Sequence, residues 1–137
     1  MNLSKEKLHT LAYNLNELCL NLDEHYDINN GGCCFVAACI AECLEKYGIE
    51  FSVLVYDCYE NEFNEIDCSH YHYMIVFNNT IINNMSYCSG TLYTYVDSEM
   101  LFQHFNECSW NETYDTTLND NVKEQIIYCF EQSLSEE

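Results

Sequence analysis

A cysteine and a histidine in this chain have the spacing that nucleophilic catalysis would need. Cys33 follows a turn-forming segment, residues 29–32, and begins a stretch with helical periodicity. A thiol at a helix N-terminus meets unpaired backbone N–H groups and the positive end of the helix dipole, which both favour thiolate. His72 lies in a strand-like segment over residues 69–77, and Asn83 ends the next strand after a short turn. The sequence therefore predicts a cysteine nucleophile, an imidazole base and an orienting amide in that order.

Apolar periodicity predicts the helices that position these residues. Ser4 is expected to cap a helix whose leucines recur at three- and four-residue steps as far as Leu22. A second helix, short and lined with alanine, is expected from Cys33 to Tyr47, and Gly48 is expected to stop it. Further helices are expected over 98–105, with Ser98 as cap, and from residue 120 or 121 onward.

Alternating β-branched and aromatic residues predict four strands between these helices, over 51–56, 70–77, 80–83 and 91–96. Asn78-Asn79 is expected to close a tight hairpin. Helices followed by a sheet meander indicate an α+β fold, with N-terminal helices, including the central helix of Cys33, packed on a small antiparallel sheet, and C-terminal helices. With 137 residues the chain is expected to form one domain, 1–137.

The ordered set of motifs resembles a known group of enzymes. It consists of Gly31-Gly32-Cys33 with Ala37 four positions later, Gly48-Ile49 before a strand, His72 at a strand start and Asn83 at the end of the following strand. Over roughly residues 29–84 this set resembles the papain-like and transglutaminase-like cysteine enzyme superfamily. The resemblance implies that Cys33 is the nucleophile, His72 the base and Asn83 the residue that orients the base. It also implies a small hydrolase or acyltransferase that acts on an amide or thioester of a protein or peptide without a cofactor.

The chain departs from that pattern beside the nucleophile. Papain-like proteases usually carry an aromatic residue after the cysteine and a glutamine several residues before it, whereas this chain has Cys34 and, upstream, Asn29 or Asn30. The oxyanion is then expected to be stabilised by the backbone N–H of Cys33 and an asparagine amide, with Cys34 adjacent. Asn83 replaces the aspartate usual in transglutaminase-like enzymes, so the reaction stays open among proteolysis, deamidation and acyl transfer.

Several assignments have alternatives. Cys34 has Ala38 four positions on and competes with Cys33, although helix phase favours Cys33. His70 and His72 share one strand face, and only the spacing to Asn83 favours His72. A zinc site would use the thiols and imidazoles of Cys58, Cys68, His70 and His72. No C-x-x-C pair is present and both histidines stand on one strand, so no metal is expected.

The charge balance restricts the partners. Asp and Glu number 23 against four lysines and no arginine, which gives a formal net charge of −19. We do not expect the chain to bind nucleic acid directly, because affinity for phosphate depends on Lys and Arg. The plain interpretation of the charge is a solvated, self-repelling surface. The alternative to the enzyme is a catalytically silent acidic binding protein, such as a DNA-mimic inhibitor encoded by a phage against a basic host protein.

The first residues and the cysteines predict the compartment. The N-terminal segment leads into an amphipathic pattern, and no apolar run is long enough to cross a membrane. We therefore expect a cytoplasmic protein whose ten cysteines are mostly reduced and buried, with a disulfide framework as the alternative. The oligomeric state is left open.

Overall fold

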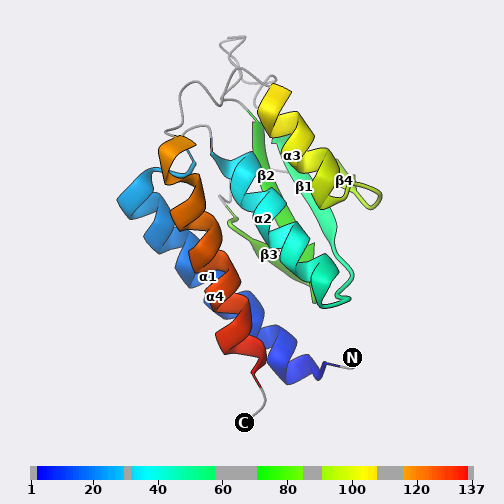
Figure 1. Ribbon diagram of the computed structural model, residues 1–137. Coiled ribbons are helices and arrows are strands. Elements are labelled where there is room, and N and C mark those ends of the chain that lie inside the picture. Colours follow the sequence, from blue (N-terminus) through cyan, green and yellow to red (C-terminus); the bar gives the residue numbers. More distant parts are fainter. Residues whose placement is uncertain (1–2, 30–31, 58–70, 85–90, 108–115, 136–137) are drawn as a thin grey trace.

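The computed structural model describes residues 3–29, 32–57, 71–84, 91–107 and 116–135. The elements in chain order are α1 (Lys5–Tyr26), α2 (Cys33–Lys46), β1 (Ser52–Asp57), β2 (Tyr71–Phe77), β3 (Thr80–Ile82), β4 (Thr91–Tyr93), α3 (Ser98–Glu107), a 3-10 turn (Thr116–Leu118) and α4 (Asn119–Leu134). Helices α1 and α4 lie side by side and antiparallel, while α2 lies between this pair and the sheet (Figure 1). The chain is α+β, as the sequence predicts.

Local signals place the ends of the first two helices where the sequence predicts them. The Ser4 hydroxyl accepts a hydrogen bond of 3.1 Å from the Lys7 backbone N–H, which caps α1. Helix α2 ends at Lys46, and Gly48 follows with φ of 70°, a left-handed conformation that glycine adopts without strain. The Ile49 N–H then donates to the Leu44 carbonyl at 2.9 Å and closes the helix end.

The sheet is antiparallel, with the strand order β3-β2-β1-β4. Asn78 and Asn79 both have positive φ, 51° and 57°, which suits a two-residue hairpin turn between β2 and β3. Val55 faces Tyr73 of β2, and Val53 faces Tyr93 of β4. Because side chains alternate along a strand, Val53, Val55 and the odd-numbered residues of β2 share one face of the sheet.

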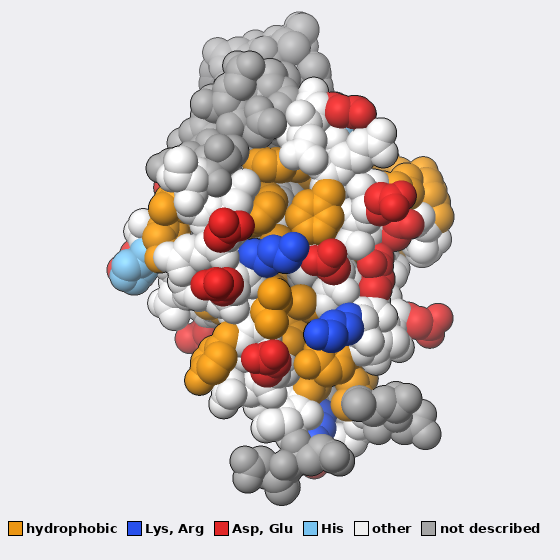
Figure 2. All heavy atoms as spheres, viewed as in Figure 1, with side chains coloured by type: hydrophobic (Ala, Val, Ile, Leu, Met, Phe, Trp, Pro, Cys, Tyr) orange, Lys and Arg blue, Asp and Glu red, His pale blue; other side chains and the backbone are white. Residues whose placement is uncertain are grey.

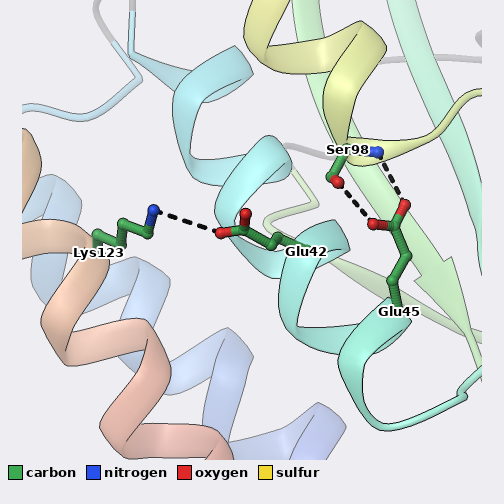
Figure 3. Close-up of polar contacts among 4 residues, drawn as sticks. All are labelled: Glu42, Glu45, Ser98 and Lys123. Carbon is green, nitrogen blue, oxygen red and sulfur yellow. Dashed lines mark hydrogen bonds and ion pairs between the residues drawn. The ribbon is translucent and has the colours of Figure 1, made fainter.

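Helix α2 occupies the centre of the core. Eleven of its residues are buried, and they join buried residues of the other helices and of β1, β2 and β3 in one cluster. A helix that is apolar on nearly every side needs partners on every side. Its exposed acids tie it to two neighbours: Glu42 lies 3.3 Å from the Lys123 ammonium of α4, and the Glu45 carboxylate accepts from the N–H and hydroxyl of Ser98 at the start of α3 (Figure 3).

Several boundaries differ from the sequence prediction. The Asp97 carboxylate, at 2.9 Å from the Met100 N–H, caps α3 in place of Ser98, whose hydroxyl is engaged by Glu45. Strand β4 ends at Tyr93 rather than residue 96, and α4 begins at Asn119. His70 lies outside the described residues, so β2 is described from Tyr71. No described helix combines the length and apolarity that crossing a bilayer would need.

The α1–α4 contact gives a direct test of the core. Leu15 of α1 is fully buried, whereas Leu20 of the same helix is 67% exposed. Leu15→Ala should lower the free energy of unfolding by about 2–5 kcal/mol, because it leaves a cavity in a packed region. Leu20→Ala should change it by less than about 0.5 kcal/mol. Urea denaturation followed by circular dichroism measures both, and equal effects would contradict this packing.

Candidate functional site

Cys33 is the first residue of α2, preceded by Gly32 at the N-cap position. Its side chain is only 2% exposed. Backbone hydrogen bonds from Tyr73, Cys34 and Cys33 itself favour the thiolate, but desolvation is larger and raises the pKa of the Cys33 thiol to about 11. In the folded protein, burial therefore opposes the thiolate that the sequence predicts at this helix start.

The two adjacent cysteines face different neighbours. The Cys34 thiol is fully buried and donates to the Leu101 carbonyl of α3 at 3.4 Å. Cys33 lies against Tyr73 of β2. Of the two, Cys33 thus lies against β2, the strand to which His72 also belongs. Cys34 is directed to α3 rather than to an oxyanion position.

The His72 ring is 6% exposed and is held by Asn83. Its Nε2 lies 2.7 Å from the Asn83 backbone carbonyl, so Nε2 carries the proton and donates. Desolvation lowers the pKa of His72, while this hydrogen bond and the Asp23 charge oppose the shift. The ring is neutral near pH 7, and Nδ1 keeps a lone pair.

Within the described residues, the hydrogen bond of the His72 ring goes to Asn83 and none joins it to the Cys33 thiol. Alternation along β2 places His72 with Met74 on the face opposite Tyr73 and Ile75. Ile75 belongs to the core cluster that contains Cys33, and Met74, although buried, does not. The structure thus brings His72 to Asn83, as predicted, but does not show a Cys33–His72 contact.

Asn83 belongs to an amide network that the sequence did not reveal in full. Its φ is 64°, and its side chain exchanges two hydrogen bonds with the Asn29 amide, at 3.0 and 3.3 Å. Its N–H donates to Asn16 Oδ1 at 2.8 Å, and the Asn29 N–H donates to Asp23 Oδ1 at 2.9 Å. The side chain predicted to orient His72 is therefore engaged by Asn29, and the backbone carbonyl takes that role instead.

This network includes one of the predicted oxyanion residues. The Asn29 amide is bound to the Asn83 side chain, and Asn30 lies outside the described residues. The sequence pattern did not predict that Asn16 and Asp23 would take part in this network. Their spacing of seven residues, which places both on one face of α1, was the signal available in the sequence. A pocket of about 320 Å³ borders the network, and its described walls include neither Cys33 nor His72.

Most of the residues of the alternative zinc site lie outside the part of the chain that the structure describes. Cys58, Cys68 and His70 are not among the described residues. Among the residues that are described, no group of three or more His, Cys, Asp or Glu side chains could hold a metal ion. No disulfide joins the six cysteines that the structure describes.

No protein-family model, curated protein or solved structure matches this chain. The resemblance to papain-like and transglutaminase-like enzymes therefore rests only on the residues given for it above.

The buried thiols make stability sensitive to alkaline pH. A raised pKa in the folded state keeps Cys33 neutral up to about pH 11, while the unfolded thiol deprotonates from about pH 9. This stabilisation is complete below the unfolded pKa and is lost as pH rises toward 11. Between pH 8 and 10, the free energy of unfolding of the wild type should fall by on the order of 1 kcal/mol more than that of Cys33→Ala. Urea denaturation under reducing conditions measures the difference, and parallel pH curves would contradict the burial of this thiol.

Proposed function

We propose that this chain is an acidic binding protein whose partner is a basic protein, and that the partner docks in the groove between α1 and α4. The groove has a volume of about 370 Å³. Glu17 of α1 and Glu124 of α4 contribute one carboxylate from each side, and Leu18 and Tyr128 add apolar surface. Carboxylates beside exposed apolar side chains suit lysine or arginine, whose long stems pack while the charge is paired.

The charge of the described surface supports this proposal. Glu42 with Lys123 is the ion pair found among the described residues, so neither Glu17 nor Glu124 has a cationic partner there. No described aspartate or glutamate is buried. Figure 2 shows acidic side chains spread over one face with hydrophobic ones between them and few lysines. A surface with this imbalance attracts cationic surfaces at long range and selects against acidic ones.

Exposed side chains on the two helices repeat this pairing of acid and apolar residues. On α1, Tyr13, Glu17, Leu20 and Glu24 are all exposed and follow at steps of four and three, so they form one stripe. On α4, Glu124, Tyr128 and Glu131 are exposed with the same steps. Exposed Tyr13, Leu20 and Tyr128 contribute apolar contact that a purely solvating surface would not need.

The chemistry of the partner follows from this surface. It presents lysines or arginines at intervals that match the groove acids, with apolar residues between them. A DNA-binding protein has such a basic face and is one member of this class.

Neutralising the groove acids should weaken binding of a basic ligand. The probe is a synthetic peptide that alternates Lys and Arg with Leu, and its affinity is measured by fluorescence anisotropy at low and physiological salt. The double variant Glu17→Gln, Glu124→Gln should bind roughly threefold to tenfold more weakly, because two exposed ion pairs are lost. Affinity for the wild-type protein should fall as salt rises.

The matched control changes net charge by the same amount elsewhere. Glu50 and Glu107 are exposed and do not line this groove. The double variant Glu50→Gln, Glu107→Gln should lose less than about twofold in affinity. If the two double variants lose affinity equally, the charge acts only as a diffuse field and the groove is not the site.

The cysteine hydrolase is a second candidate, and the state of His72 favours it. The ring is neutral, its Nε2–H is held by the Asn83 carbonyl, and Nδ1 is left as the basic nitrogen. That is the arrangement a general base needs. In this mechanism Cys33 Sγ would attack an amide or thioester carbonyl, Nδ1 would take the thiol proton and pass it to the leaving group, and water would hydrolyse the thioester. The mechanism would require His72, which stands on the face of β2 opposite Tyr73, to come within hydrogen-bond reach of the Cys33 thiol, which lies against Tyr73.

Thiol labelling separates the two candidates. With a pKa of about 11, the thiolate fraction of Cys33 at pH 7 is about one in ten thousand, so we expect slow alkylation by iodoacetamide in the folded protein. Mass spectrometry with time gives the rate for each cysteine. Labelling of Cys33 well ahead of Cys39 and Cys43 that is lost in His72→Ala but kept in His70→Ala would contradict this expectation and favour the hydrolase.

A further inference from the structure

A pocket on the other side of the molecule has a different lining from the groove. It has a volume of about 350 Å³ and lies between α3 and the β1–β4 side of the sheet. Three tyrosines line it, Tyr73, Tyr93 and Tyr95, together with aliphatic side chains that include Val53, Val55 and Met100. We call it the tyrosine pocket. Its volume is within the range of small-ligand sites.

The sheet register explains how the tyrosines meet. Tyr73 on β2 is the partner of Val55, and Tyr93 on β4 is the partner of Val53. Directly opposed residues of antiparallel strands share a face, so both tyrosines stand on the side of the sheet that α3 covers. Tyr95 follows β4 and is 71% exposed, at the edge of the pocket.

Ring geometry gives the pocket fixed aromatic walls. The Tyr93 and Tyr95 rings lie 5.9 Å apart at an interplanar angle of 89°. Tyr73 and His104 of α3 are 5.5 Å apart at 70°, and the Tyr73 hydroxyl lies 2.6 Å from His104 Nδ1. This hydrogen bond ties the buried Tyr73 ring to α3. Tyr93 and Tyr95 therefore meet edge to face, and a cation over the face of a tyrosine ring is attracted by it.

The ligand class follows from what the walls contain. No carboxylate is among the described residues that line the pocket. A bare ammonium would lose hydration there without an ion pair. A methylated ammonium spreads its charge over apolar methyl groups, which suit the aliphatic walls, and the charge is attracted by tyrosine rings. Asp97 and Glu99 flank the pocket residues Val96 and Met100 in sequence and are exposed, so they add negative potential nearby.

We propose that the tyrosine pocket binds a methylated ammonium group. This proposal is independent of the α1–α4 groove, because the pocket is lined by different elements. The group could be carried by a small quaternary ammonium ion or by a methylated lysine side chain. The two sources share the chemistry that the pocket recognises.

Two probes of equal shape test the charge. Choline carries a trimethylammonium group, and 3,3-dimethylbutan-1-ol replaces it with a neutral tert-butyl group. NMR titration that follows tyrosine ring signals should show choline binding about fivefold or more tightly than the neutral alcohol. Equal affinity, or no saturable shift with either probe, would overturn the proposal. A short peptide with trimethyllysine, compared with the same peptide with lysine, distinguishes the sources: tighter binding than choline assigns the site to a protein side chain, and weaker binding to a small ion.

Tyr95 suits substitution, because replacing a side chain with this exposure should leave the fold intact. Tyr95→Phe keeps the aromatic ring and should retain choline binding within about twofold, whereas Tyr95→Leu keeps apolar bulk and should lose about fivefold. Leu92→Ala, at a leucine of β4 that is 54% exposed and does not line the pocket, is the control and should change nothing. Equal loss in Tyr95→Phe and Tyr95→Leu, or none in Tyr95→Leu, would contradict a role for the ring.

Discussion

The burial of α2 is the constraint on which the rest of this structure depends. Eleven of its residues are buried, so water is excluded from nearly every side of the helix. The sheet and α3 cover one part of it and the α1–α4 pair another (Figure 1). Its exposed acids then fix the neighbours in place, Glu42 through Lys123 and Glu45 through Ser98. The groove and the tyrosine pocket both lie outside this central helix, among elements that are rigid because they pack on it or on one another.

The same burial decides the chemistry of the thiols. A helix N-terminus contributes only a modest preference for thiolate, whereas removing a thiolate from water costs more. Burial raises the pKa of Cys33 and of Cys43 to about 11 and that of Cys19 to about 12. In this core, cysteine acts as a small apolar residue that packs beside alanine.

The sequence predicted the fold better than the site. The Ser4 cap, the Gly48 stop and the Asn78-Asn79 turn depend on neighbouring residues, so local pattern was enough to place them. How deeply Cys33 is buried depends on α3, β2 and the core cluster, which no local pattern encodes. The partner of Asn83 was unpredictable for the same reason: Asn16 and Asn29 are 67 and 54 residues away along the chain. Spacing alone therefore placed His72 beside Asn83 but could not decide which atom of Asn83 would hold the ring.

Some surface carboxylates add to the effect of burial on the pKa of the buried cysteines. Asp23 raises the pKa of Cys19, and Glu42 raises those of Cys39 and Cys43, in addition to desolvation. Asp23 and Glu42 thus add to the cost of forming a thiolate at these three cysteines. A cysteine nucleophile would need local cations to offset this field, and the chain has four lysines in all. The net charge of −19 therefore supports the proposed binding of a basic partner more than the alternative of a cysteine hydrolase.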